Sequence, residues 1–452
     1  MRSERLPSSL RTKLWKGCFA VALFIASLFI LDFVMSGPQP AKGSGFGLDY
    51  IAFYRAGMLV HTGHADRLYD LQDTRNFDSA LAQRQNLSLG NNYAPFLNPP
   101  FFALLFAPLA MLGYTPSLVI WLLINISCCA GAAALLCRII PAEYDLDPNL
   151  EPLRDWKNYA LVPALMLVSL PFLQTIGHAQ NTGVSLLLMT WAVVSWRDGR
   201  AFTAGVAAGI LFYKPQLAAL VLAAMAITLG WRALAGACAS LGSLLLLNVL
   251  ALPGTLTDYL HRLGPNVQYM MATHPYIWQR HATFNGFWHV TLNQLSPEIA
   301  SSTATYLAIL CSMPVAFGLL LCIWRNRKST SRDRIIAAVI ATAPLIMPYY
   351  LDYDLLLLAV PAVLLASEMI DRDSSQPLPK GDVWLIRLWI AFFLLLLINP
   401  ALTKVLQVNL SVPMLTAIAG LAIARAIRGA SAQNSETDSK NFLNSCRWYV
   451  AA

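Results

Sequence analysis

The sequence has few charged residues for its length. Asp, Glu, Lys and Arg make up only 12% of the 452 residues, and 57% are hydrophobic. In soluble proteins about a quarter of the residues are charged. A soluble fold cannot bury so much apolar surface, and long apolar runs recur from end to end. The sequence therefore predicts an all-α polytopic membrane protein built as one bundle rather than a row of domains.

Several signatures of catalysis and ligand binding are also missing. The chain has no Gly-rich phosphate loop, no Gly-x-Ser-x-Gly elbow and no Cys or His cluster with zinc spacing. The eight cysteines have neither disulfide nor metal spacing, so buried apolar thiols are expected. These absences argue against ATP-driven and thiol chemistry. No cofactor is predicted, and nothing in the sequence requires a metal.

The basic residues do not form a surface for nucleic acid. The net charge is +8, but the Lys and Arg residues stand in short stretches between apolar runs, where they orient helices in a membrane. A nucleic-acid partner is therefore not expected. The expected partners are the bilayer and substrates that reside in it or reach its surface. The sequence does not indicate an oligomeric state.

The apolar runs predict a bundle of about twelve transmembrane helices within residues 1–429. A polar tail, 430–452, follows and is expected to be cytoplasmic and disordered. The predicted spans are about 14–35, 115–138, 157–174, 178–196, 201–213, 215–230, 233–252, 300–323, 334–350, 354–370, 384–402 and 411–428. Several are short and require tilt or a thin bilayer.

The run from Pro99 to Leu112 decides the topology. If this run does not cross, most Lys and Arg residues, including the group between Arg325 and Arg334, lie on the cytoplasmic side, as the positive-inside rule requires. Both termini are then cytoplasmic, in a bacterial inner membrane. Two long loops, about 37–113 and 254–298, lie in the periplasm and carry short juxtamembrane helices. Because all seven histidines then lie outside, the working site is expected to face the periplasm.

Asp49 follows the first predicted span, where a carboxylate at the membrane edge can act as a general base. Since a helix is expected to begin at Tyr50, capping of that helix is the alternative role. Tyr54 and Arg55, on the same helix, are candidate sugar or acceptor ligands.

Lys214 interrupts a long apolar stretch at the predicted outer edge of the hydrocarbon. Pro215 starts a new helix, whose unpaired N–H groups and positive dipole end lie beside the lysine. A lysine at a helix N-terminus outlines a phosphate site, and snorkelling of the lysine is the alternative. Gln216, the next residue, is a candidate sugar ligand.

Arg280 and His281 lie in the second long loop among aromatic residues. They can neutralise a phosphate leaving group, while aromatic rings stack on sugars and Asn285 binds hydroxyls. An interfacial aromatic belt explains the aromatic residues equally well.

Two predicted outer turns are rich in polar side chains. The first holds His178, Gln180 and Asn181, and the second holds Tyr349 and Asp352. Such groups either bind the hydroxyls of a sugar or cap the helices on both sides of the turn.

Taken together, six motifs in order resemble the GT-C class of polyprenol-phosphate-dependent glycosyltransferases, and specifically glycosyltransferase family 87. The resemblance covers about residues 45–360. The motifs are Asp49-Tyr50 with Phe53-Tyr54, Leu68-Tyr69-Asp70, Pro95-Phe96 with Pro99-Pro100, Gly177-His178-Ala179-Gln180-Asn181, Ala204-Gly205 with Tyr213-Lys214-Pro215-Gln216, and Pro348-Tyr349 with Leu351-Asp352-Tyr353-Asp354. In this chain Asn98 stands where family members often have an aromatic residue before the two prolines.

The resemblance implies a membrane transferase that moves one sugar, similar to mannose or arabinofuranose, from a polyprenyl-phosphate carrier to a lipid or glycan acceptor of the cell envelope. It implies inversion at the anomeric carbon, with Asp49 as the general base. Lys214, Arg280 and His281 are the candidates for the donor phosphate.

The main alternative is a transporter or flippase of lipid-linked sugars. Transporters place polar groups near the midplane, often at matching positions of two repeats. The chain has no internal repeat, and its polar candidates gather on one side of the membrane, which favours the enzyme. A transferase of a whole lipid-linked glycan is a second alternative.

Overall fold

The computed structural model describes residues 13, 15–24, 47, 49–85, 95–140, 156–272, 276–327, 329, 332–370 and 377–429. Within these ranges the protein is helical, and the β-structure is limited to one isolated bridge between His281 and Leu351. The all-helical prediction is confirmed. The predicted tail, 430–452, lies outside the described residues, as do residues 25–35 of the first predicted span.

The helices follow the chain order below. They are α2 (Tyr50–His61), η1 (Ala65–Arg67), α3 (Leu71–Gln85), η2 (Pro100–Leu105), α4 (Ala107–Ala110), α5 (Tyr114–Cys137), α6 (Trp156–Leu167), α7 (Leu170–Gly177), α8 (Thr182–Arg197), α9 (Ala201–Ile210), η3 (Leu211–Tyr213), α10 (Pro215–Leu229), α11 (Trp231–Ala251), α12 (Thr255–Ala272), η4 (Trp278–Arg280), α13 (Phe284–Thr291), α14 (Pro297–Asn326), α15 (Asp333–Ile346), η5 (Asp352–Leu358), α16 (Ala359–Ile370) and α17 (Lys380–Leu406). Two further helices are Trp15–Phe24 and Ser411–Gly429.

Five helices of the described chain are long and apolar enough to cross a membrane. They are α5, α11, α14 (over Ile299–Asn326), α17 and Ser411–Gly429. The bent pair α6 and α7, with an angle of 63° between its helices, makes a sixth candidate. Other predicted spans coincide with shorter helices, such as the 16-residue α8. At about 1.5 Å per residue, α8 is shorter than a hydrocarbon core of about 30 Å. The number of twelve crossings therefore stays a prediction.

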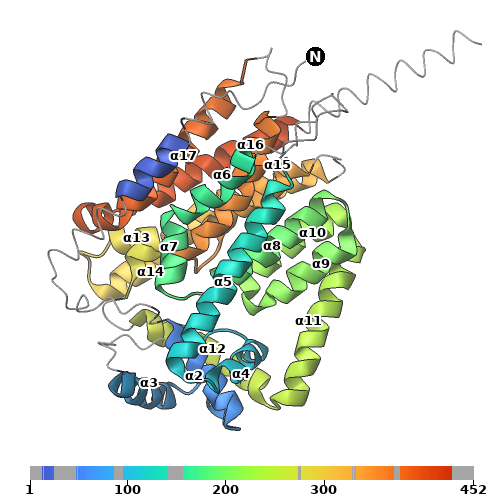
Figure 1. The fold of residues 1–452 in the computed structure, drawn as a ribbon. Coiled ribbons are helices and arrows are strands. Elements are labelled where there is room, and N and C mark those ends of the chain that lie inside the picture. The colour runs from blue at the N-terminus through green and yellow to red at the C-terminus, as the bar shows by residue number, and fades with distance from the viewer. Residues whose placement is uncertain are drawn as a thin grey trace, which may run out of the picture.

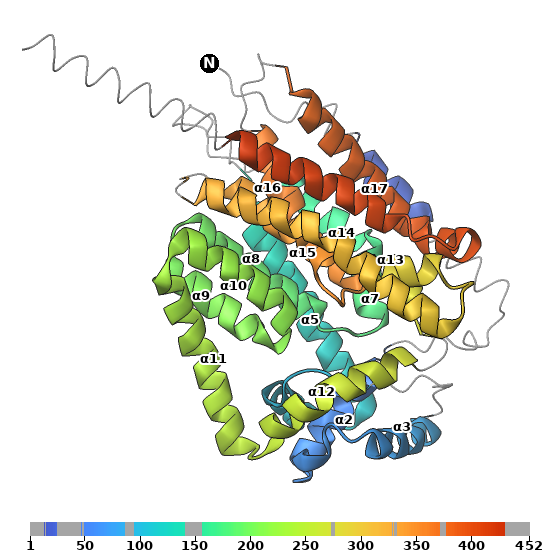
Figure 2. The same ribbon diagram turned by 180° about the vertical axis from the view of Figure 1, so that it is seen from behind.

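The molecule has two parts along the direction of its long helices. Figures 1 and 2 show α2, α3, α4 and α12 gathered at one end, and α5 and α11 extend from the main bundle to reach them. On the side of the bundle opposite α9 and α11, the helix Trp15–Phe24 lies beside α17 in both views. The short helices of the first predicted outer loop and α12 of the second thus form one compact group, while α13 packs against α14 in the main bundle.

The Pro99–Leu112 run forms η2 and α4, two short helices that together are too short to cross a bilayer. Their aromatic side chains are buried against α2 and α5. Phe106 stacks on Phe53 with a centroid distance of 5.0 Å and meets Trp121 edge-on at 4.7 Å. This aromatic core fixes α2, and with it the position of Asp49 at the start of α2.

Ion pairs gather at the other end of the bundle. Arg425 binds Glu368 at 3.0 Å and Asp382 at 3.2 Å, and Arg334 also contacts Glu368. These residues lie at the helix ends that the basic-residue pattern assigns to the cytoplasm. This grouping agrees with the prediction that successive helices cross the membrane in opposite directions. The side of the membrane that each end faces stays a prediction.

Helices α9 and α11 pack with their backbones in close contact. A Cβ atom added at Gly205 would lie 1.9 Å from the carbonyl oxygen of Ala233, and one at Gly236 would lie 2.1 Å from that of Phe202. Small residues at such crossings let helices approach, which matters in a membrane because lipid tails are as apolar as the helix surfaces. The Ala204-Gly205 pair therefore contributes to packing.

We expect Gly205→Ala to destabilise the protein by roughly 1–3 kcal/mol, because the added methyl group overpacks the α9–α11 contact. Equilibrium unfolding in mixed micelles measures the change. Gly242→Ala is the matched control, since a Cβ there meets nothing within 4 Å. Equal stability of the two variants would contradict the close packing.

Candidate active site

Asp49 lies at the junction between the first outer loop and the α7–α8 turn. Its Oδ2 atom accepts a 2.7 Å hydrogen bond from Gln180 Nε2 and lies 3.5 Å from His178 Nδ1. The backbone N–H of Gly47 donates to the carbonyl of Gly177 at 2.7 Å. Asp49 occupies the N-cap position of α2, but its side chain makes no capping hydrogen bond. The carboxylate therefore faces the turn instead of the helix that it precedes.

The α7–α8 turn is held in an uncommon backbone conformation. Ala179 is fully buried and has a φ of +51°, a left-handed conformation that is uncommon for a residue other than glycine. The indole N–H of Trp121 donates to its carbonyl at 2.9 Å. Because Trp121 also packs on Phe106, the aromatic core that fixes α2 holds the turn that meets Asp49.

A bidentate ion pair joins the second outer loop to the start of η5. Arg280 Nε donates to Asp352 Oδ2 at 2.9 Å, and its Nη2 donates to Asp352 Oδ1 at 2.8 Å. Nη2 also lies 3.4 Å from Gln174 Oε1 of α7. Burial opposes the charge on Arg280, but Asp352, with a smaller contribution from Asp49, raises the pKa of the guanidinium. Arg280 is therefore a permanent cation in the neighbourhood of Asp49.

A second, more deeply buried ion pair involves Lys214. Its Nζ lies 2.6 Å from Asp354 Oδ1, which also accepts a 2.9 Å hydrogen bond from Thr182. The two charged side chains are only 9% and 6% exposed. Lys214 is the N-cap residue of α10 and Pro215 its first residue, so the predicted helix break is present. The lysine does not snorkel to solvent, because its charge is paired inside the protein.

The ring of Tyr353 lies between the two ion pairs. Lys214 Nζ is 5.8 Å and Arg280 Cζ is 5.7 Å from its centroid, both within range of a cation–π contact. One aromatic ring thus joins the two pairs into a single cluster.

His178 is the titratable neighbour of Asp49. Burial lowers the pKa of the imidazole, and Arg280 lowers it further, while Asp49 and Asp352 act in the opposite direction. The net lowering favours the neutral ring at neutral pH. The side chains of Asp49 and His178 are 32% and 30% exposed, so both are accessible, in contrast to the Lys214–Asp354 pair.

His281 is fully enclosed. Its Nε2 is 2.9 Å from the hydroxyl of Tyr276, and its backbone pairs with Leu351. Burial, with a smaller contribution from Arg280, lowers the pKa of the ring to about 3. The ring is therefore neutral and packed, and it positions Arg280, the preceding residue, rather than presenting a charge to solvent.

The remaining predicted ligands are placed as follows. Tyr54 is buried against Tyr114 with edge-on rings 5.3 Å apart, and Arg55 forms a buried ion pair with Asp78. Both side chains therefore stabilise the packing of the outer helices. Tyr349 meets the ring of His281 edge-on at 4.9 Å and borders the cluster.

The three other predicted ligands are amides. Asn181 is buried, and its backbone carbonyl accepts from Tyr213 at 3.2 Å. Asn285 lies on α13 and Gln216 on α10, both partly buried. The structure thus brings Asp49, His178, Gln180, Arg280, Asp352 and Lys214 into one region, with Tyr349 at its border.

Sequence reasoning did not select Asn409. Its Nδ2 donates to the carbonyl of His281 at 3.0 Å and to that of Gln279 at 3.2 Å. This residue holds the segment that carries Arg280. The only signal in the sequence is its place in the short polar turn between the last two predicted spans. Asp354 belongs to the motif that contains Asp352, and nothing in that motif indicates its pairing with Lys214.

Within the described part of the chain, no group of three or more His, Cys, Asp or Glu side chains lies close enough together to hold a metal ion.

Comparison with known protein families matches residues 96–348, more than half of the chain, to glycosyltransferase family 87. The chain belongs to glycosyltransferase family 87. The protein is therefore a membrane glycosyltransferase, as the motifs predicted. Searches of curated proteins and of solved structures found no match. The matched residues include His178, Lys214 and Arg280, whereas Asp49 and Asp352 lie outside them.

We expect Lys214→Met to destabilise this family 87 protein by about 3–5 kcal/mol, because the substitution leaves the buried Asp354 carboxylate unpaired. The double variant Lys214→Met/Asp354→Leu is expected to lose less, since it removes both charges. Equilibrium unfolding in micelles measures the coupling. Additive losses in the double variant would show that the two groups do not interact.

The buried imidazole of His281 predicts a pH dependence of stability. As pH falls from about 6.5 towards about 3, the unfolded ring binds a proton that the buried ring does not, so the folded state loses stability. Between pH 7.5 and pH 5, His281→Phe should reduce this loss by up to about 2 kcal/mol. Tyr276→Phe is the control, because it removes the same hydrogen bond but keeps the histidine. If both variants show the wild-type pH slope, the assignment is wrong.

Proposed function

We propose that the protein transfers one sugar from a polyprenyl-phosphate carrier to a lipid or glycan acceptor of the cell envelope, with inversion at the anomeric carbon. Asp49 acts as the general base. The observation that supports this role most directly is the position of its carboxylate. It is accessible, it makes no capping hydrogen bond to α2, and it lies near the permanent cation Arg280.

The proposed reaction is a one-step displacement. Asp49 takes the proton of the acceptor hydroxyl while that oxygen bonds to the anomeric carbon. The bond between the anomeric carbon and the phosphate oxygen breaks, and the electron pair leaves with the polyprenyl phosphate. A phosphate is a good leaving group when a cation stabilises its developing charge, so the reaction requires no second carboxylic acid.

Arg280 is the favoured cation for the donor phosphate. Its Nε and Nη2 donate to Asp352, and Nη1 makes no hydrogen bond to another described residue. An arginine can thus keep its structural partner and still donate to a phosphate, because it has five N–H groups. Lys214 is the deeper candidate, and the donor phosphate has to compete with Asp354 for it. The packed ring of His281 helps to position Arg280, the preceding residue.

The remaining polar groups suit a sugar. Gln180 and His178 flank the base, and Tyr349 and Tyr353 border the cations. Amides and imidazoles bind hydroxyls, and aromatic rings bind the apolar faces of sugars. Mannose and arabinofuranose are the proposed sugars, on the family resemblance alone. The proposed orientation places this cluster on the periplasmic side of the inner membrane.

The test is sugar transfer by the purified protein in nanodiscs, supplied with polyprenyl-phosphate mannose or arabinofuranose and envelope lipid acceptors. We expect Asp49→Asn to lower the transfer rate by about 100-fold or more, the usual contribution of a general base. The control is Asp66→Asn, which removes an exposed acid of the same outer segment. Inversion is read from the anomeric configuration of the product.

Transfer that persists at the wild-type rate in Asp49→Asn would exclude Asp49 as the base. If the wild-type protein transfers no sugar from any donor, translocation of lipid-linked sugars across proteoliposomes is the next measurement. Translocation without transfer would support the transporter alternative.

A further inference from the structure

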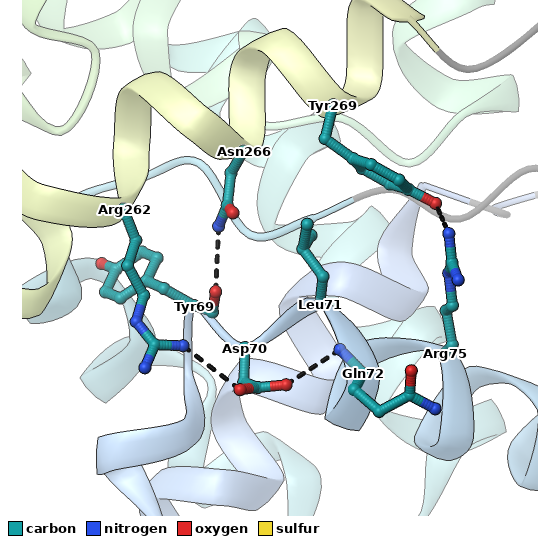
Figure 3. Close-up of a pocket in the computed structure, with 8 residues that line it drawn as sticks. All are labelled: Tyr69, Asp70, Leu71, Gln72, Arg75, Arg262, Asn266 and Tyr269. Carbon is teal, nitrogen blue, oxygen red and sulfur yellow. Dashed lines mark hydrogen bonds and ion pairs between the residues drawn. The ribbon is translucent and has the colours of Figure 1, made fainter.

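A cavity of about 490 Å³, lined mostly by residues with polar groups, lies between α3 and α12, in the group of outer helices (Figure 3). Its volume falls in the range of about 300–1,000 Å³ that is typical of small-molecule sites. It is separate from the Asp49 cluster, whose residues do not line it. Neither the family match nor the proposed reaction accounts for it.

The polar groups on the α3 side are held in fixed orientations. Asp70 Oδ1 accepts hydrogen bonds from the backbone N–H groups of Gln72 at 2.8 Å and Asp73 at 3.0 Å, which caps α3. Its Oδ2 lies 3.2 Å from Arg262 Nη1 of α12. The N–H of Asp73 contributes most to lowering the pKa of the Asp70 carboxyl. The cavity thus contains a charged acceptor beside a charged donor.

The α12 side adds an amide and an aromatic ring. Asn266 Nδ2 donates to the carbonyl of Tyr69 at 3.0 Å, and Arg75 lies over the ring of Tyr269 with its Cζ 5.0 Å from the centroid. Figure 3 shows these side chains converging from the two helices on one space. Helices α3 and α12 are therefore joined by several polar contacts around the cavity.

This lining suits a carbohydrate better than an apolar ligand. Sugar hydroxyls both donate and accept hydrogen bonds, and here arginines, amides and a carboxylate alternate around two tyrosines. Leu71 is the only aliphatic residue of the lining. The two arginines outnumber the single aspartate, so the cavity tolerates a sugar unit that is neutral or carries negative charge.

The cavity is connected to the reaction cluster through Tyr69. Its hydroxyl donates to the carbonyl of Asn98 at 2.8 Å, and Asn98 Nδ2 donates to the carbonyl of Tyr213 at 3.0 Å. Tyr213 directly precedes Lys214. Two hydrogen bonds therefore join the cavity wall to the segment that carries the buried lysine.

We infer that this cavity binds a sugar unit of the acceptor that lies away from the reacting hydroxyl. The inference rests on the proposed function, because it takes the acceptor to be a glycan or glycolipid. Binding of a remote unit positions the reacting hydroxyl relative to Asp49 and sets which acceptors are used.

The test measures glycan binding without turnover. Asp49→Asn protein in nanodiscs is titrated with mannobiose and with an arabinofuranosyl disaccharide, and binding is read by saturation-transfer NMR. Added separately to this background, Arg262→Gln is expected to weaken binding of the preferred disaccharide about tenfold, the loss for a hydrogen bond to a charged group, and Gln72→Ala about fivefold, the loss for a neutral one. Arg84→Gln is the control, because it makes the same charge change at an exposed position of α3 outside the cavity.

Two results would overturn the inference. One is the absence of saturation transfer to either disaccharide, and the other is equal binding by the cavity variants and the Arg84→Gln control. Thermal unfolding of each variant shows that the outer helices remain folded. A failure of sugar transfer by the wild-type protein would count against the proposed function and leave this binding result unchanged, so the two outcomes are distinguishable.

Discussion

A charge that is taken out of water must be paired, and the candidate site depends on this constraint. Lys214 is paired with Asp354, whose carboxylate also accepts a hydrogen bond from Thr182, and Arg280 is held by both oxygens of Asp352. Because Asp352 and Asp354 are separated by one residue in η5, a single segment orients both cations. That segment in turn packs against α7, α8 and α15. The orientation of the two cations therefore depends on how η5 packs in the bundle.

The same constraint explains how Asp49 differs from its neighbours. The other acids of the cluster are partnered by arginine or lysine, whereas Asp49 contacts an amide and an imidazole whose lowered pKa favours its neutral form. The aromatic core of Phe53, Phe106 and Trp121 fixes α2 and the α7–α8 turn relative to each other. It thereby fixes the position of Asp49, which the ion pairs do not contact.

Much of the architecture could be predicted from local sequence patterns. The helix break at Lys214-Pro215 follows from the missing N–H of proline, and the failure of the Pro99–Leu112 run to cross follows from the charge distribution of the later loops. Other features could not be predicted, because they depend on residues far apart in the chain. The pairings of Lys214 with Asp354 and of Arg55 with Asp78, and the burial of His281 beneath Tyr276, have no local signature.

The sequence by itself determined the helical membrane class, the family and the group of residues from which the site is built, since hydropathy and short motifs are local properties. The tertiary structure decided which of those residues meet. In the folded protein Tyr54 and Arg55 pack within the outer helices, and Asp49 contacts the α7–α8 turn. Folding also brings Arg262 and Asn266 of α12 next to Asp70 and Tyr69. The physical reason is that hydrogen bonds and ion pairs act over a few ångströms, so only folding determines which distant groups come within reach.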